Sequence, residues 1–116
     1  MRGDDERAYR HARRALALCT EADRPTLASH ALNGVGWYAA RLGDHDTARA
    51  NCQAALALLR DLGDAYEVAN TLDRLGQPLA ALGRTDQARA VWAEALTLFR
   101  EQSRHDDAAR VQRLLD

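Results

Sequence analysis

The chain has 116 residues, of which 47% are hydrophobic, and its formal net charge at pH 7 is −1. An apolar content this high argues against a disordered segment, and the balanced charge gives no reason to expect direct binding to nucleic acid or to a membrane surface. No apolar run reaches the roughly 18 residues of a membrane span, and the polar stretch from Met1 to Arg10 does not form a secretory signal. We therefore expect a folded cytoplasmic domain in which Cys19 and Cys52 are reduced core residues.

The predicted elements are all helices, inferred from the spacing of apolar residues and from signals at the helix ends. They span about 4–22, 25–42, 44–61, 65–82, 84–102 and 105–115. Asp64 followed by Glu67 has the spacing of a capping box at a helix start. Tight turns between paired helices are expected where glycine can adopt a left-handed backbone. These glycines are Gly3, Gly43 and Gly83.

The sequence repeats itself at an offset of 40 residues. Ten of 24 positions are identical between 41–64 and 81–104, including an Ala-Arg-Ala run that begins at Ala48 and again at Ala88. Each period is one helix pair, so we interpret residues 1–116 as a single repeat domain. Its parts are the second helix of a partial first unit (4–22), a second unit (25–61), a third unit (65–102) and a C-terminal capping helix (105–115), which an open-ended stack needs.

Small residues at fixed places in each unit resemble those of a known family. Their order is similar to that of the tetratricopeptide repeat, although the unit is about six residues longer than the usual 34 and lacks the closing proline. Trp92 matches the large aromatic residue of the family's second helix, whereas the earlier copy has Cys52 there. The matching small residues are Gly36, Gly43, Ala48 and Ala55 in one unit and Gly76, Gly83, Ala88 and Ala95 in the next.

The resemblance implies an all-α solenoid of about six helices, arranged as antiparallel pairs in a right-handed superhelix. It also implies a non-catalytic module that binds a protein or a peptide. The long, arginine-rich unit is similar to the C-terminal repeat arrays of bacterial antibiotic-regulatory transcriptional activators and of related signal-transduction ATPases. On this resemblance we expect the C-terminal segment of a bacterial regulatory protein. The alternative is an assembly element that contacts neighbouring domains or a second copy and has no separate peptide ligand.

Residue types that could carry chemistry do not form a catalytic or metal-binding pattern. No two histidines have the i, i+3 or i, i+4 spacing of a helical metal pair. Neither Ser29 nor Ser103 lies in the sequence context of a nucleophile elbow, and there is no glycine-rich phosphate loop. We therefore expect no enzymatic activity, no cofactor and no metal site.

A candidate ligand groove follows from the resemblance, which implies that the first helix of each pair lines the concave side. Because interface anchors are enriched in tryptophan and arginine, we expect Trp37 to be partly exposed in this groove, with Trp92 in the core. The alternative is that Trp37 packs against a neighbouring helix. The predicted groove residues are His30, Asn33, Gly34, Trp37 and Arg41 in one helix and Asn70, Asp73, Arg74 and Gln77 in the next.

The N-terminal segment contains the second helix of a unit whose first helix is missing. The stripe that such a partner would cover includes Ala8, Ala12 and Ala15. Since exposed apolar patches usually mark interfaces, we expect self-association through residues 5–19. The predicted centre of this homodimer contact is Tyr9, Ala12 and Leu16. Alternatively, the chain is the C-terminal piece of a longer protein whose preceding helix covers the stripe.

Overall fold

The computed structural model describes residues 2–116, apart from the side chain of Arg2. Six helices and no strand occur in this part of the chain, so the predicted all-α repeat array is confirmed. Every helix end lies close to its predicted position. The helices are α1 (Arg2–Glu21), α2 (Pro25–Arg41), α3 (His45–Leu62), α4 (Ala65–Ala81), α5 (Thr85–Glu101) and α6 (His105–Leu115).

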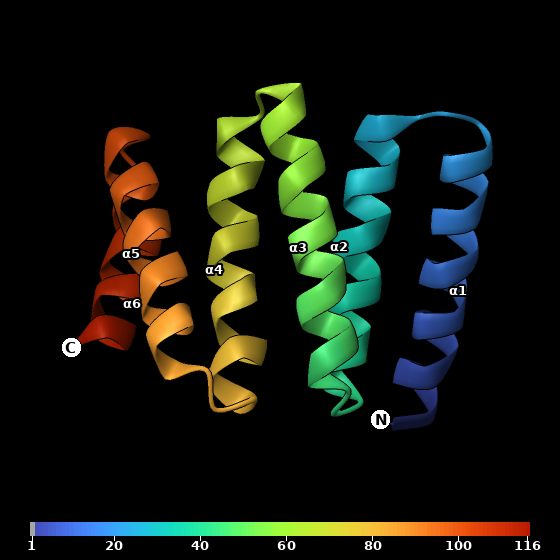
Figure 1. Cartoon of the computed structure of the whole chain (residues 1–116), viewed down its shortest axis with the longest axis horizontal. Coiled ribbons are helices and arrows are strands. Elements are labelled where there is room, and N and C mark those ends of the chain that lie inside the picture. Colours follow the sequence, from blue (N-terminus) through green and yellow to red (C-terminus); the bar gives the residue numbers. More distant parts are fainter. Residues whose placement is uncertain (1) are drawn as a thin grey trace.

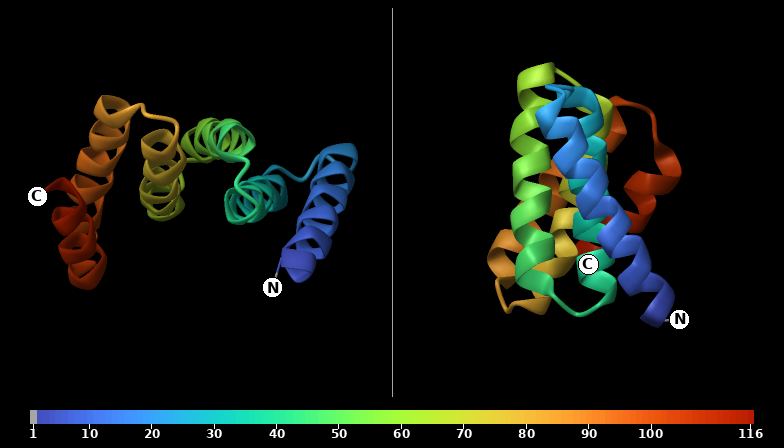
Figure 2. Two further views of the ribbon diagram at one scale, coloured as in Figure 1. Left: turned by 90° about the horizontal axis from the view of Figure 1, so that it is seen from below. Right: turned by 90° about the vertical axis from the view of Figure 1, so that its right-hand side faces the viewer.

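The helices form an open array in which each packs mainly against its neighbours in the chain (Figure 1). The views in Figure 2 place α1 and α6 at opposite ends of this array. One further contact joins α2 to α4, the first helices of consecutive pairs. Such nearest-neighbour packing is typical of solenoid proteins. No helix within residues 2–116 has the combination of length and apolar character needed to cross a membrane.

The turns between helices follow the 40-residue period. Gly43 and Gly83 have φ angles of 84° and 79°, as predicted for the turns inside the two complete units. The prediction for Gly3 is wrong, because this residue lies in the first turn of α1 and not before it. One half of the predicted capping box is confirmed, since the side chain of Asp64 accepts a hydrogen bond of 3.1 Å from the backbone N–H of Glu67. The Glu67 carboxylate accepts a hydrogen bond of 3.4 Å from Nδ2 of Asn70.

A second series of turns connects consecutive units, and here too the backbone is left-handed. Gly63 ends α3 with a φ of 70°. The equivalent positions 40 residues before and after it are Asp23, with a φ of 52°, and Ser103, with a φ of 56°. Glycine adopts this conformation at little cost and aspartate tolerates it, whereas it is uncommon for serine. The fold therefore imposes a left-handed turn on Ser103, which does not favour it.

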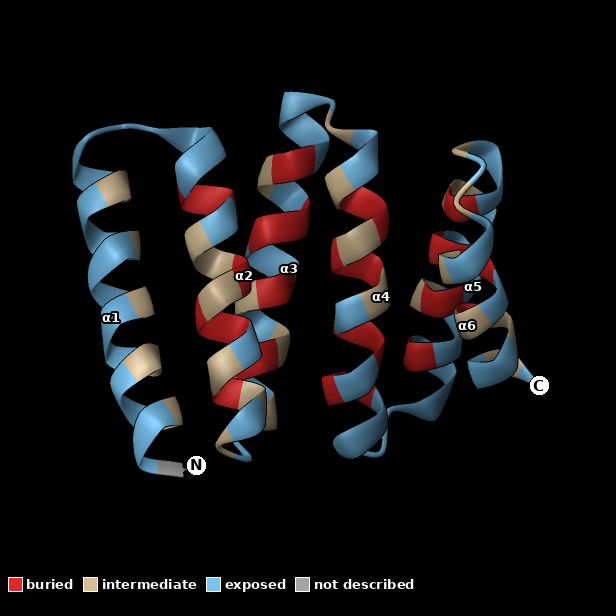
Figure 3. Cartoon of the chain, turned by 180° about the vertical axis from the view of Figure 1, so that it is seen from behind, coloured by how far each residue is buried: buried red, intermediate tan, exposed pale blue. Residues whose placement is uncertain are grey.

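The apolar core is concentrated in the C-terminal part of the array. A continuous cluster of buried side chains extends from α3 to α6 and includes Leu59, Leu72 and Phe99. In α1, by contrast, none of the described residues is buried, and Figure 3 shows this helix only in the colours of half-buried and exposed residues. Ala48 and Ala88, which hold equivalent places in the two complete units, are both buried.

Candidate ligand groove

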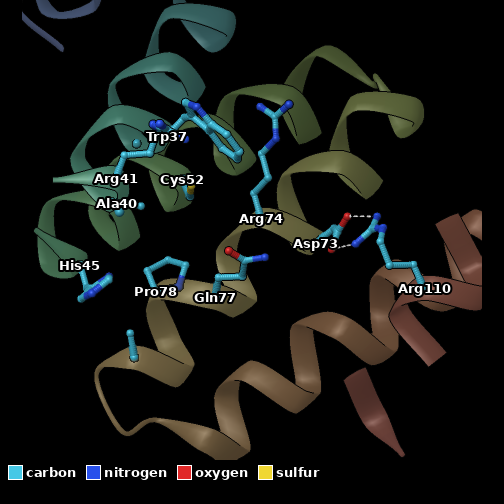
Figure 4. Close-up of a pocket in the computed structure, with 13 residues that line it drawn as sticks. Trp37, Ala40, Arg41, His45, Cys52, Asp73, Arg74, Gln77, Pro78 and Arg110 are labelled. Carbon is cyan, nitrogen blue, oxygen red and sulfur yellow. Dashed lines mark hydrogen bonds and ion pairs between the residues drawn. The ribbon is translucent and has the colours of Figure 1, made fainter. Parts of the chain in front are cut away.

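A pocket of about 560 Å³ lies between α2, α3 and α4, with one residue contributed by α6. It opens between the first helices of the two complete units, where the predicted groove runs. Figure 4 shows the side chains that surround it. The lining residues are Gly36, Trp37, Ala40, Arg41, His45, Ala48, Cys52, Asp73, Arg74, Gln77, Pro78, Ala81 and Arg110.

The floor of the pocket is made of small and apolar residues. A Cβ atom on Gly36 would lie 3.2 Å from Sγ of Cys52 and 3.3 Å from the carbonyl oxygen of Ala48, so α2 and α3 approach closely at this point. Burial raises the pKa of the Cys52 thiol to about 11, which keeps it uncharged near neutral pH. The floor therefore offers an apolar surface to whatever enters the pocket.

Trp37 and Arg74 stand at the mouth of the pocket. Their side chains point toward one another from α2 and α4 (Figure 4), with the guanidinium carbon of Arg74 6.0 Å from the centre of the Trp37 ring. This distance is at the outer limit of a cation–π contact. The Trp37 side chain is 49% exposed, so the prediction that this residue is partly accessible is confirmed.

The other charged groups of the pocket are already paired. Asp73 accepts two hydrogen bonds from the guanidinium of Arg110, one of them 3.0 Å long, and this pairing raises the pKa of Arg110. Arg41 donates a hydrogen bond of 2.8 Å from Nε to a carboxylate oxygen of Asp5, which holds the pKa of Asp5 below its usual value. Within residues 2–116, Arg74 forms no ion pair. Its positive charge is therefore available for an ion pair with a ligand.

A sequence model of the tetratricopeptide repeat family matches residues 28–101. The match covers more than half of the chain and includes every residue that lines the pocket except Arg110. The chain belongs to the tetratricopeptide repeat family. Members of this family generally mediate protein–protein interactions and are generally not catalysts. No curated protein gave a significant match. Among the described residues, no cluster of three histidine, cysteine or acidic side chains could hold a metal ion.

The position of Asn33 corrects the predicted groove of this tetratricopeptide repeat. Asn33 is only 4% exposed, and its Nδ2 donates a hydrogen bond of 3.1 Å to the hydroxyl oxygen of Thr71. Asn33 therefore links α2 to α4. It was predicted to face the groove, and this placement is wrong. The physical reason is that these first helices touch each other, so one face of each is covered by its equivalent in the next unit.

The other predicted groove residues divide into two groups. Trp37, Arg41, Asp73, Arg74 and Gln77 line the pocket. Outside its lining, His30 is exposed, Gly34 packs toward α1, and the side-chain oxygen of Asn70 accepts a hydrogen bond from Arg104.

Eight lining residues were not among the predicted groove residues, and four of these are the small residues Gly36, Ala40, Ala48 and Ala81. Arg110 follows Asn70 by one period of 40 residues, so extending the groove positions of the repeat into the capping helix would have identified it. Cys52 was assigned to the core because the equivalent position in the next unit holds Trp92, which was expected to be buried. His45 and Pro78 lie at helix positions that the family pattern does not mark as inward-facing.

The predicted centre of self-association stays a prediction, because its residues are only partly covered within the chain. Tyr9, Ala12 and Leu16 are half-buried by the chain itself. Ala12 faces Gly34 of α2, where an added Cβ would lie 3.8 Å from the Ala12 Cβ. Tyr9 and Leu16 line a shallow second cavity together with Val35, Thr47 and Asn51. Because α1 lies against α2 with this stripe, its exposed apolar side chains are instead Ala15, Ala17 and Leu18.

Proposed function

We propose that the pocket between α2, α3 and α4 binds a segment of a partner protein, with Trp37 as its anchor. The observation that carries this proposal is a half-exposed tryptophan beside an unpaired arginine at the mouth of an open pocket with an apolar floor. Tryptophan and arginine dominate the energetic centres of protein interfaces, because both offer a large contact area together with polar groups. A partner that covers Trp37 would remove a large apolar surface from water.

The remaining lining residues have roles that follow from their pairing. Gln77 is exposed and has both a donor and an acceptor for a partner backbone. Asp73 is held by Arg110, and both line the walls of the pocket. Arg41 lines it as well and is held by Asp5, which lies outside the lining. His30 and Asn70 lie on the same first helices but outside the pocket, and we assign them to the rim of the binding surface.

We further propose that the chain works inside a bacterial regulatory protein in the cytoplasm. The support is the resemblance of its long, arginine-rich units to the repeat arrays of bacterial transcriptional activators and related ATPases. In such a protein, a partner-binding arm would sense another protein and transmit its presence to the rest of the regulator.

The alternative role as an assembly element has a specific observation in its favour. Leu18 on α1 is 59% exposed, and Ala15, about one helical turn before it, is exposed as well. If copies associate through this part of α1, Leu18→Glu will shift the species seen by multi-angle light scattering toward the monomer, whereas Tyr66→Glu, an equally exposed site on α4, will not. A wild-type chain that is monomeric at every concentration would reject this role.

The experiment that tests the groove is a binding measurement with matched exposed apolar residues. A partner isolated on the wild-type chain is purified and titrated against Trp37→Ala and against Leu62→Ala, which removes a side chain that is 42% exposed and outside the pocket. We expect Trp37→Ala to weaken binding by at least about tenfold, the loss typical of an interface anchor, and Leu62→Ala to leave it unchanged. Equal binding by wild type and Trp37→Ala, with unchanged circular dichroism, would reject the groove.

A further inference from the structure

The two complete units differ at one position that adjoins the pocket. Residue 92, on α5, is a tryptophan, and residue 52, at the equivalent place on α3, is a cysteine. The indole of Trp92 lies directly over Gly76, where an added Cβ would overlap it. Its Nε1 donates a hydrogen bond of 3.1 Å to the backbone carbonyl oxygen of Asp73. In this unit, a side chain from the protein itself fills the space beside the first helix.

In the unit made of α2 and α3, the smaller side chain of Cys52 lies beside the equivalent glycine, with its Sγ 3.2 Å from a Cβ added to Gly36. The equivalents of Gly76 and Asp73 are Gly36 and Asn33, 40 residues earlier. Cys52 faces Gly36 but extends only one heavy atom beyond its Cβ. Gly36 and Cys52 both line the 560 Å³ pocket, so the place of the absent indole is part of the pocket floor. The pocket is thus a consequence of cysteine replacing tryptophan in one copy of the repeat.

We propose that this pocket receives a large apolar side chain of the partner, aromatic or leucine, in the place that Trp92 occupies in the next unit. The inference rests on the proposed function of the groove and adds the chemistry of the residue that it recognises. The second unit supports this inference, because its Trp92 lies over Gly76, the equivalent of Gly36. Burying such a side chain in a preformed apolar pocket typically contributes a large share of the binding free energy.

The charges at the mouth define the neighbours of this anchor residue. Arg74 has no carboxylate partner in the described chain, whereas Asp73 and Arg41 are paired within the protein. The unpaired charge beside the pocket is therefore positive. The partner segment that complements it has a large apolar residue flanked by aspartate or glutamate, since lysine or arginine there would be repelled.

Four capped peptides test this assignment by NMR titration of the uniformly ¹⁵N-labelled chain. They are acetyl-Ala-Glu-Trp-Glu-Ala-amide, the same peptide with Leu or with Ala at the centre, and acetyl-Ala-Lys-Trp-Lys-Ala-amide. We expect the Trp and Leu peptides to shift the amides of Gly36, Cys52 and Gln77. We expect the Ala and Lys peptides to bind at least about tenfold more weakly, a difference of about 1.4 kcal/mol.

Variants of Cys52 give the complementary test. Cys52→Trp fills the space as Trp92 does one unit later, so it should abolish the shifts caused by the Trp peptide. Leu62→Ala, which removes an exposed side chain outside the pocket, is the control and should bind as wild type does. If Cys52→Trp does not fold, Cys52→Met takes its place, because methionine fills irregular gaps and adapts to them.

The outcomes separate this inference from the proposed function. Equal affinity for the Trp and Ala peptides, shifts confined to other helices, or full binding by the filled variant would overturn the anchor assignment. A purified partner that depends on Trp37 but binds Cys52→Trp normally would leave the groove in place and reject only the anchor. A partner that depends on neither residue would reject both.

Discussion

The unit formed by α2 and α3 and the unit formed by α4 and α5 follow the same 40-residue pattern, but their interiors differ. In the second unit, Trp92 fills the space over Gly76 and joins a core that continues into α6. In the first, the smaller Cys52 lies beside Gly36, and both residues line the open pocket. The helix that precedes the first unit, α1, has no buried residue among those described, whereas α6 buries Ala108 and Val111.

The difference shows how a repeat protein can separate stability from binding. Units with a common backbone need not be filled alike, because each depends mainly on its nearest neighbours. A filled unit stabilises the array, and a unit with a smaller side chain provides a binding pocket at the cost of packing energy. This explanation can be tested with variants in which a residue of one unit is changed toward its equivalent in the other.

The largest effect is expected for Trp92→Cys, which gives the second unit the residue of the first. The indole is buried, so its loss removes packing and leaves a cavity over Gly76. The free energy of unfolding should fall by about 3 kcal/mol, within the range for large-to-small core changes. Urea denaturation followed by circular dichroism measures this loss. Cys52→Ala is the control and should cost clearly less; equal losses would mean that the two units are filled alike.

A pair of glycine substitutions should give the next largest difference. Gly76→Ala places a methyl group inside the buried indole of Trp92, so the ring must move, and we expect a loss of about 2 to 3 kcal/mol. Gly36→Ala meets Cys52 Sγ at 3.2 Å and a backbone oxygen at 3.3 Å, which requires only a small shift. Because alanine favours the helix by about 1 kcal/mol, the net cost at Gly36 should stay below about 1 kcal/mol. Urea midpoints of the two variants that coincide would contradict the difference in packing.

The N-terminal end should be sensitive to acid in a way that the core is not. The hydrogen bond from Arg41 lowers the pKa of Asp5, so the folded pKa lies below the unfolded value. The contribution of this pair is present above the unfolded carboxyl pKa of about 4 and is lost as the pH falls through the folded value. Asp5→Asn should therefore speed hydrogen exchange of α1 amides above the unfolded carboxyl pKa, and the difference from wild type should diminish as the pH falls through the lower folded value.

Hydrogen exchange in α4 and α5 provides the internal control for this measurement. These helices belong to the filled unit, and the hydrogen bond between Arg41 and Asp5 joins α2 to α1 instead. Their exchange should be the same in wild type and in Asp5→Asn at every pH. A uniform change over all helices would show that α1 unfolds together with the core and would remove the distinction between the two ends.

The smallest effect is expected in the turns that connect consecutive units. Ser103 has a φ of 56°, in the left-handed region, where glycine costs less than serine. Ser103→Gly should raise the free energy of unfolding by about 0.5 kcal/mol, because relief of backbone strain slightly exceeds the added entropy of the unfolded chain. The reverse change at the equivalent turn, Gly63→Ser, should lower it by about the same amount. Urea midpoints that move in the same direction for both variants would contradict this explanation.

Much of the fold follows from local signals in the sequence. The helix ends were predicted from the 40-residue period, from the capping pair Asp64 and Glu67, and from the turn glycines Gly43 and Gly83. These features act within one or two helical turns, so they do not depend on the rest of the molecule. The exposure of Trp37 and the burial of Trp92 also followed, since their places in the repeat determine which side of a helix they occupy.

The tertiary structure decided which side chains pair across the groove. Asp73 meets Arg110 and Arg41 meets Asp5 over separations of 37 and 36 residues, and no short-range pattern marks these partners. The contact of α2 with α4 buries Asn33, and the packing of α1 on α2 covers Tyr9 and Leu16. The repeat thus determined each helix and its faces by itself. The unpaired charge and the open pocket emerge only when helices from different units meet, because they depend on distances between side chains that are remote in the chain.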